Sequence, residues 1–140
     1  MSRILTASIR DLCGGDHKND PARVAGWTAN KTEAGVAKML ANPIQTMLVA
    51  ERDGVVAAVG AVGHDGEIRL NYVDPAHRFA GVSRALLDAM EAELRSRGYA
   101  QATLTSTGTA HRFYGSAGWT DTGPAEDHDG MVCYPMKKRL

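Results

Sequence analysis

The sequence predicts an α/β fold, of the α+β kind, in which about four helices flank a mostly antiparallel mixed sheet of about six to seven strands. Three observations support this prediction. A long amphipathic helix follows a strand near the middle of the chain. Three strand-like segments joined by Asp–Gly turns precede that helix. Shorter helical and extended segments alternate after it.

The long helix is predicted to begin at Val82 and to end before Gly98. Its apolar residues recur at helical spacing and share one face: Val82, Ala85, Leu86, Ala89, Met90 and Leu94. Charged residues occupy most of the other positions. Arg95 and Arg97 lie in the last turn, where their charge suits the helix dipole, and Gly98 suits a left-handed cap.

Three strands are expected before this helix, over residues 46–51, 55–62 and 67–73. Asp53–Gly54 and Asp65–Gly66 are typical of hairpin turns, so the three strands should form an antiparallel meander. The middle segment is almost entirely apolar and is therefore expected to be buried on both faces of the sheet.

The N-terminal part is predicted to contain one strand and three helical segments: a strand over 3–8, the start of a helix over 9–13, and helices over 22–27 and 33–41. Pro21 is well placed at a helix start, and Thr32 is a suitable N-cap for the last of these helices.

After the long helix, the sequence predicts a strand, a short helix and a final antiparallel pair of strands: residues 102–106, 110–117, 119–122 and 131–137. The strand over 102–106 should pair in parallel with the strand over 67–73, because the long helix provides the crossover that a parallel pair needs. A polar, acidic loop is expected over 123–130.

Composition restricts the class of protein. The length of 140 residues predicts a single domain over 1–140. With 16 basic and 16 acidic residues the formal net charge is +0, which argues against a dedicated nucleic-acid or membrane-surface protein. Cys13 and Cys133 have no companions at metal-ligand spacing, so no metal site is expected. Without a signal peptide or membrane span, the expected location is cytoplasmic.

The loop from Arg78 to Ser83 is a candidate anion site. Asp74–Pro75 ends the preceding strand, and the loop enters the long helix through Gly81. Free backbone N–H groups at a helix start bind anions, and a glycine lets an anion approach the backbone closely. Arg78 adds a fixed positive charge with several donors. The segment therefore predicts a site for a pyrophosphate group.

Two motifs resemble the GNAT family of N-acetyltransferases. The first is a strand, then Arg78-x-x-Gly81-x-Ser83, then a long helix, which is similar to the family's acetyl-coenzyme A motif, Arg-x-x-Gly-x-(Gly/Ala). The second runs from Ala110 to Trp119 and is similar to the family's Ala-x-x-x-Tyr-x-x-x-Gly-aromatic segment. Ser83 departs from the first pattern, where the family has glycine or alanine.

The resemblance implies the GNAT acyl-CoA acyltransferase fold, with acetyl-CoA (acetyl-coenzyme A) as cosubstrate and no metal. In that fold two central strands diverge, and the cofactor enters between them. The implied pyrophosphate contacts come mostly from the backbone of one loop: Arg78, Phe79, Ala80, Gly81, Val82 and Ser83. A bulge would turn the backbone of Tyr72 and Val73 toward the acetyl group and pantetheine. Thr107 stands where the family often has an asparagine that contacts pantetheine.

The resemblance also implies catalytic residues. Tyr114 matches the family's tyrosine, which protonates or hydrogen-bonds the departing sulfur; a phenol of pKa about 10 can donate to a thiolate whose acid has a pKa of about 8.5. Glu67 precedes Arg78 by eleven positions, where some members place a basic glutamate, and it is the candidate general base. His111 is a weaker candidate, and ordered water serves in many members.

The predicted function is direct transfer of an acetyl group from acetyl-CoA to a primary amine in a ternary complex. The sequence does not identify the acceptor amine, which is either a small molecule or a peptide. It also leaves open whether the chain forms a homodimer. The alternative is a non-catalytic acyl-CoA-binding or interaction domain of the same fold. A hydrolase with Ser83 as nucleophile is disfavoured, because that motif needs a larger sheet and ordered Asp and His partners.

Overall fold

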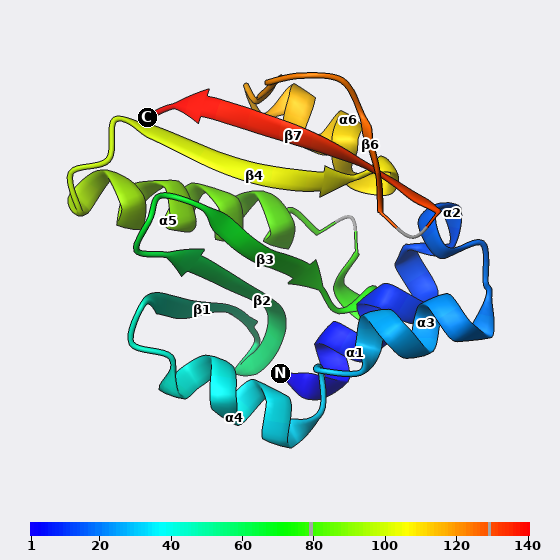
Figure 1. Cartoon of the computed structure of the whole chain (residues 1–140). Coiled ribbons are helices and arrows are strands. Elements are labelled where there is room, and N and C mark those ends of the chain that lie inside the picture. The colour runs from blue at the N-terminus through cyan, green and yellow to red at the C-terminus, as the bar shows by residue number, and fades with distance from the viewer. Residues whose placement is uncertain (79, 129) are drawn as a thin grey trace.

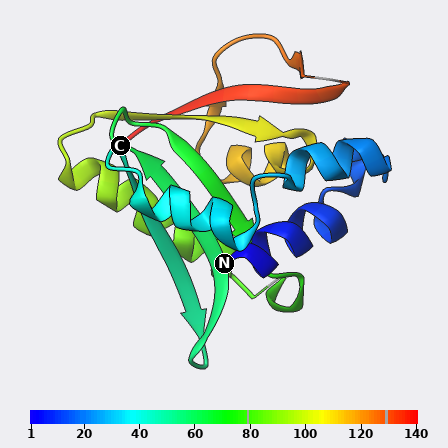
Figure 2. The ribbon, with the colours of Figure 1, turned by 60° about the horizontal axis from the view of Figure 1, so that its bottom comes forward.

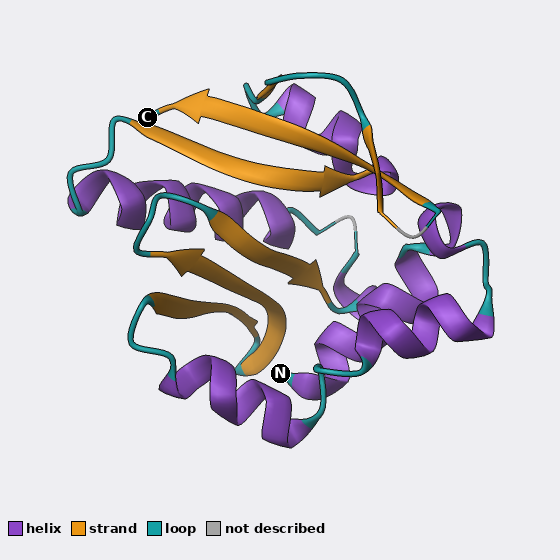
Figure 3. Cartoon of the chain, viewed as in Figure 1, coloured by secondary structure: helices purple, strands orange, loops and turns teal. Residues whose placement is uncertain are grey.

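The structure is a computed structural model of the chain, and it describes residues 1–78, 80–128 and 130–140. Figures 1 and 3 show the elements. Four helices come first: α1 (Ser2–Leu12), α2 (Gly14–His17), α3 (Pro21–Thr28) and α4 (Glu33–Ala41). Three strands, a 3-10 turn and a long helix follow: β1 (Gln45–Arg52), β2 (Val55–Gly63), β3 (Ile68–Val73), the turn Pro75–His77 and α5 (Val82–Ser96). The C-terminal elements are β4 (Gln101–Thr107), α6 (Gly108–Ser116), β5 (Thr120–Asp121), β6 (Glu126–His128) and β7 (Met131–Arg139).

The strands form two sheets that touch at one end. One sheet has the order β1-β2-β3, and the other has β4-β7-β5 with β6 also on β7; all pairs inside each sheet are antiparallel. A parallel bridge between Glu67 and Thr103 joins the two sheets, and the Thr103 N–H donates to the Gly66 carbonyl at 3.1 Å. Beyond this bridge β3 and β4 diverge, as Figure 1 shows.

The predicted fold class is confirmed. Within the described residues there are seven strands and six α-helices, and the strand pairing is mostly antiparallel. The number of helices exceeds the four or so that the sequence predicts, because the N-terminal part is helical throughout. Among the described residues, none of the helices has the length and apolar character that crossing a membrane requires.

The predicted first strand over residues 3–8 is wrong, because this segment belongs to α1. The buried residues of α1 are Ile4, Leu5, Ser8 and Ile9, and their spacing places them on one face of a helix. A window of six residues is too short to separate this pattern from a strand. The predicted helix over 9–13 is the second half of α1, which ends at Leu12.

The predicted parallel pairing of the third and fourth strands is also largely wrong. It is limited to the bridge at Glu67, and β4 instead pairs along its whole length with β7, from Gln101 opposite Arg139 to Thr107 opposite Cys133. The predicted final antiparallel pair, residues 119–122 with 131–137, is confirmed only in part. On the first of these segments only Thr120 and Asp121, which form β5, pair with β7. Pairing with β7 leaves the opposite edge of β4 facing β3.

The loop predicted over 123–130 is wrong in part, because Glu126–His128 forms the strand β6 by pairing with β7. Several predictions for single turns and helix ends are confirmed. Thr32 caps α4 by accepting a hydrogen bond from the Gly35 N–H at 3.1 Å, and α4 covers the predicted range. Asp53 and Gly54 both have positive φ, as a tight hairpin turn requires. The long helix α5 begins at Val82, as predicted, and Gly98 adopts positive φ after its end.

Helices cover both faces of the sheet β1-β2-β3, and Figure 2 shows α4 and α5 on opposite sides of it. On one side α5 contributes the fully buried Leu87, Met90 and Leu94. On the other side α1 and α4 contribute a smaller apolar cluster that includes Leu5 and Val36. The strand β2 lies between these two layers and is buried over most of its length, as predicted.

An ion pair between the buried Glu91 of α5 and the partly buried Lys138 of β7 links the long helix to the second sheet, and its removal should destabilise the fold. Lys138 Nζ lies 2.7 Å from Glu91 Oε1, and it also donates to the Ala117 carbonyl at 2.8 Å. Replacing Lys138 by methionine leaves the 5%-exposed Glu91 side chain without its cationic partner, with only the Trp119 Nε1–H at 3.4 Å as a side-chain donor. We expect Lys138→Met to lower the free energy of unfolding by about 3 kcal/mol at neutral pH, measured by urea denaturation.

The exposed neighbouring residue Arg139 provides the control. Arg139→Met should change the free energy of unfolding by less than about 0.5 kcal/mol. Equal effects of the two substitutions would contradict this account.

Candidate active site

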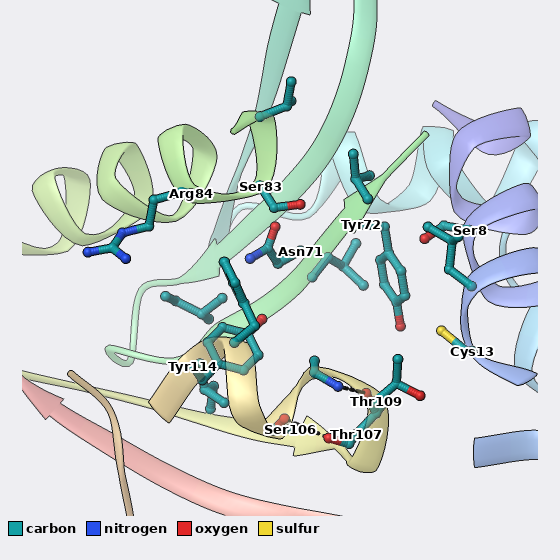
Figure 4. A pocket seen from close by; sticks show the side chains of 18 of the residues that line it. Ser8, Cys13, Asn71, Tyr72, Ser83, Arg84, Ser106, Thr107, Thr109 and Tyr114 are labelled. Carbon is teal, nitrogen blue, oxygen red and sulfur yellow. Dashed lines mark hydrogen bonds between the residues drawn. The ribbon is translucent and has the colours of Figure 1, made fainter. Parts of the chain in front are cut away.

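A cavity of about 390 Å³ lies where β3 and β4 diverge. Figure 4 shows it from close by. Its walls come from five elements: residues 68–73 of β3, 104–107 of β4, the start of α5 at 81–84, one face of α6, and Ser8, Leu12 and Cys13 at the end of α1. The cavity is therefore enclosed by segments that are far apart in the sequence.

The opening exists because each wall strand is paired on only one side. Within the described residues β3 pairs with β2 and β4 pairs with β7, apart from the bridge at Glu67. The edges that face each other therefore present backbone N–H and C=O groups without strand partners. An extended ligand inserted between them can bond to these groups as an added strand does.

The start of α5 forms one end of the cavity and has the properties of an anion site. Gly81 is the N-cap residue with φ of 76°, and no side chain caps the helix. The first-turn N–H groups of this 15-residue helix are thus left for another acceptor. Val82, Ser83 and Arg84 line the cavity beside them. A Cβ at Gly81 would meet nothing within 4 Å, so the glycine is needed for its backbone conformation.

Tyr114 of α6 lines the cavity and is 7% exposed. Its ring packs edge-on against Phe113 and Trp119, with centroid distances of 5.2 and 6.0 Å. Burial raises the pKa of the Tyr114 phenol to about 12, and the nearby polar side chain of Asn71 offsets part of that rise. The phenol is therefore protonated at neutral pH and is a proton donor.

A capping hydroxyl and a carboxylate hold the start of α6 in place, and thereby position Tyr114. Thr107 is the N-cap residue, and its hydroxyl accepts from the Ala110 N–H at 3.2 Å. Asp16 of α2 accepts from the Thr109 N–H at 3.2 Å and also from the Thr109 hydroxyl. A carboxylate at a helix N-terminus is favourable for the helix dipole. The helix that carries Tyr114 is thus tied to the N-terminal helices.

The Acetyltransferase (GNAT) domain family model matches residues 16–140, which is most of the chain. The chain belongs to the GNAT acetyltransferase family. The cavity between the diverging strands and the uncapped start of α5 are thus features of a GNAT acetyltransferase.

Similar proteins agree with this assignment. An IAA acetyltransferase from Azospirillum brasilense is 36% identical over 94 residues, a match that covers 61% of this chain and spans 61% of that relative's length. A GCN5-related N-acetyltransferase from Rhodopseudomonas palustris has a TM-score of 0.86 at 25% identity, over 99% of this chain and 87% of that one. The PaiA N-acetyltransferase from Thermoplasma acidophilum, solved in complex with coenzyme A, has a TM-score of 0.75 at 16% identity, over 99% and 92%. At that identity the second structure shows the fold alone.

The predicted cofactor residues of this GNAT chain are divided between the cavity and its surroundings. Eight residues named for the cofactor or for catalysis line the cavity: Tyr72, Val73, Arg78, Gly81, Val82, Ser83, Thr107 and Tyr114. Phe79 lies outside the described residues. Ala80 does not line the cavity, and its carbonyl accepts from Arg52 Nη1 at 3.1 Å.

The bulge predicted at Tyr72 and Val73 lies earlier in β3. The register shift separates Ile68 from Leu70, which leaves Arg69 as the extra residue opposite β2. The Tyr72 side chain points away from α5, toward α1 and α3, and its hydroxyl accepts from Trp27 Nε1 at 3.3 Å. Tyr72 thus forms part of the cavity wall on the side of the N-terminal helices.

Two candidate acid–base residues, Glu67 and His111, do not line the cavity. Glu67 is exposed at the start of β3, next to the bridge that joins the sheets, and it does not line the cavity. His111 also does not line it, because its ring stacks on Tyr134 and its Nε2 contacts Asp121 Oδ1 at 2.7 Å. The structure therefore does not bring either residue to the cavity.

The cavity also contains residues that sequence reasoning did not single out. Asn71, Ser8 and Cys13 all line it, from β3 and α1. Asn71 is a polar residue between Leu70 and Tyr72, and this position in the strand is a weak local signal, since Arg69 in the same strand is polar as well. Ser8 and Cys13 carried no signal, because their segment was taken for a strand followed by a helix start.

The Cys13 thiol should react slowly with alkylating reagents. Burial and the charge of Asp16 raise the pKa of the Cys13 thiol to about 12. The thiolate is the reactive species, and at pH 8 it is then a fraction of about 10⁻⁴ of the thiol, against roughly a quarter for a free cysteine. We expect iodoacetamide to modify Cys13 at least a hundredfold more slowly than in the urea-unfolded chain, measured by peptide mass spectrometry. Equal rates in both states would show that the thiol is accessible and ionised.

Proposed function

We propose that this GNAT acetyltransferase transfers an acetyl group from acetyl-CoA to a primary amine by direct attack in a ternary complex. One observation supports this most strongly. A single cavity has an anion site at one end, unpaired strand edges along its length and a buried phenol, Tyr114, beside it. These are the groups that a pyrophosphate, a pantetheine arm and a departing thiolate require.

The cofactor would lie along the cavity from α5 toward the N-terminal helices. Its pyrophosphate would accept from the backbone of Gly81, Val82 and Ser83, with Arg78 providing positive charge. Its pantetheine arm would lie between β3 and β4, against Tyr72 and Val73 on one side and Thr107 on the other. The predicted roles of Phe79 and Ala80 belong to the same loop.

The chemistry needs few protein groups. A neutral amine attacks the thioester carbonyl carbon, the carbon–sulfur bond breaks, and the thiolate takes a proton from Tyr114. The nitrogen releases its extra proton to water, and the phenol is reprotonated from solvent. The exposed position of Glu67 favours water over this carboxylate as the first proton acceptor. The raised pKa of Cys13 disfavours an acetyl-cysteine intermediate, which needs a thiolate.

The rate should rise with pH across the range in which the acceptor amine loses its proton. A lysine-like amine has a pKa of about 10.4, so its neutral fraction rises about tenfold for each pH unit below that value. Tyr114 is still protonated there, because its pKa is about 12. We expect log kcat/KM to increase with a slope of about 1 between pH 6.5 and 9.5, without a falling limb. A falling limb within this range would argue against Tyr114 as the donor.

The test of the proposed function is an assay of coenzyme A release from acetyl-CoA with a panel of primary amines. The panel contains small aliphatic amines, amino-acid amides and peptides with a free N-terminus or lysine, and mass spectrometry identifies the acetylated product. Binding of acetyl-CoA is measured beside it by calorimetry. Turnover of an amine supports the proposal, and product acetylated on oxygen contradicts the amine assignment.

The alternative is a non-catalytic acyl-CoA-binding protein of the same fold. The observation that favours it is that Tyr114 belongs to the apolar core as well as to the cavity wall. Micromolar binding of acetyl-CoA without acetylation of any amine or control peptide would support this alternative.

A further inference from the structure

We propose that the chain has a second anion site, around Lys31, which binds a carboxylate carried by the acceptor amine. The anion site is inferred from the pocket itself, whereas its use by the acceptor rests on the proposed acetyl transfer. A pocket of about 380 Å³ lies between α4 and the beginnings of β1 and β3, on the sheet face opposite α5 (Figure 2). Arg69 and Leu70 line this pocket and also the cavity described above, so the two share a wall on β3.

Lys31 is a buried cation without a counter-charge. The residue is 7% exposed and lines the pocket. Its Nζ donates to the neutral side-chain oxygen of Asn30 at 2.6 Å, and in the described part of the chain no carboxylate forms an ion pair with it. Burial lowers the pKa of Lys31, and a bound carboxylate would oppose that effect. An unpaired buried charge destabilises the folded state, and a bound anion removes that penalty.

The other charged groups around the pocket are also basic. Lys38 and Arg69 line it, and no aspartate or glutamate of the described residues does. Asp65 pairs with Arg69 at 3.3 Å, but it lies outside the lining. The larger cavity shows the same pattern, because its charged lining residues, besides His77, are arginines, and no described carboxylate joins them. A negative group on the acceptor therefore finds an opposite charge here, whereas a second positive group does not.

The surroundings of Lys31 suit a carboxylate at the end of an apolar chain. One buried ammonium balances one negative charge, which a carboxylate carries and a phosphate dianion exceeds. Met39 and Leu70 supply apolar contacts in the same pocket. Because Leu70 lines both the pocket and the cavity, an alkyl chain can pass along it and place an amino group in the cavity. The inferred acceptor class is thus an amine joined by a short apolar chain to a carboxylate.

The first test measures binding without the reaction. Hexanoate is the probe, because it has a carboxylate and an alkyl chain but no amine. At about 50 mM, with NaCl matched in the reference sample, it should raise the melting temperature of the parent by about 3 °C. Lys31→Met should abolish this rise, because it removes the cation and keeps a side chain of similar length. The melting temperature of Lys31→Met without the probe should be equal to that of the parent or higher, since an unpaired buried charge is gone.

Two controls accompany this test. Hexanamide has the same shape as hexanoate and no charge, so it should leave the melting temperature of the parent unchanged. Lys137 is an exposed lysine of β7 that lines neither the pocket nor the cavity, so Lys137→Met should keep the full rise with hexanoate. An equal rise in the parent and in Lys31→Met, or no rise in the parent, would overturn the anion site.

The second test asks whether the acceptor carries the carboxylate. Amino acids from β-alanine to 6-aminohexanoate are compared as acceptors with the amides of the same acids. For at least one chain length, kcat/KM should be at least about tenfold higher for the amino acid than for its amide. Lys31→Met should reduce this ratio to less than about twofold and should leave kcat/KM for the amide within about twofold of the parent.

The anion site and the acceptor assignment can fail separately. Hexanoate binding that depends on Lys31, without a preference for the amino acids over their amides, would overturn the acceptor assignment and make the anion a separate ligand. If no amine of either set is acetylated while hexanoate still binds, the proposed acetyl transfer fails and the anion site stands.

Discussion

Replacing Tyr114 by phenylalanine should lower kcat by about a hundredfold, the size of effect typical for the loss of a general acid. The substitution removes one hydroxyl and keeps the ring contacts with Phe113 and Trp119. Without the phenol proton, coenzyme A must leave as an unprotonated thiolate or take its proton from water. The measurement is single-turnover formation of acetylated amine with saturating acetyl-CoA.

A second tyrosine provides the matched control. Tyr134 of β7 stacks on His111 and does not line the cavity, so Tyr134→Phe removes a hydroxyl without touching the site. It should keep kcat within about twofold of the parent. The affinity of Tyr114→Phe for acetyl-CoA should also stay close to that of the parent, because the hydroxyl acts late in the reaction. If kcat is unchanged in Tyr114→Phe, water protonates the sulfur and the phenol only contributes to packing.

Replacing Gly81 by aspartate should weaken acetyl-CoA binding by at least a hundredfold. Gly81 is the N-cap of α5, where the helix dipole and free N–H groups favour a negative ligand. A carboxylate at this position competes for the same N–H groups and repels a pyrophosphate. Calorimetry with acetyl-CoA measures the change directly.

Gly81→Ala separates this charge effect from backbone strain. The φ of 76° is unfavourable for alanine by about 1–2 kcal/mol, whereas aspartate tolerates it better. A Cβ has open space at this position, so neither side chain creates a clash. We therefore expect Gly81→Ala to reduce the affinity by less than about tenfold. A larger loss for alanine than for aspartate would mean that backbone conformation, and not an anion site, makes the glycine necessary.

Elements with strong local signals could be predicted from the sequence. The face of α5 follows from apolar residues at helical spacing, the turn at Asp53–Gly54 from its need for positive φ, and α4 from the Thr32 cap. The order of the two motifs also led to Arg78, Gly81 and Tyr114, which line one cavity. Each of these signals lies within one short stretch of chain, where backbone geometry and neighbouring residues dominate the energy.

Elements without such signals were predicted poorly. Residues 3–8 fit a short strand as well as a helix, and only packing against β2 and β3 makes α1 the better structure. The pairing of β4 with β7 over seven residue pairs, in place of β3, depends on contacts between segments distant in the sequence. Local spacing contains no information on which of two available edges a strand takes.

Local patterns in the chain were enough to predict the helix α5, the hairpin turns, a glycine loop before the helix and a tyrosine in the order seen in acetyltransferases. They did not predict that β3 and β4 separate after Glu67, that Glu67 is exposed outside the cavity, or that Asn71 and Tyr114 line the same cavity. Helix faces and turns are set by near neighbours, whereas a cavity is set by which strand edges remain unpaired once the whole chain has packed.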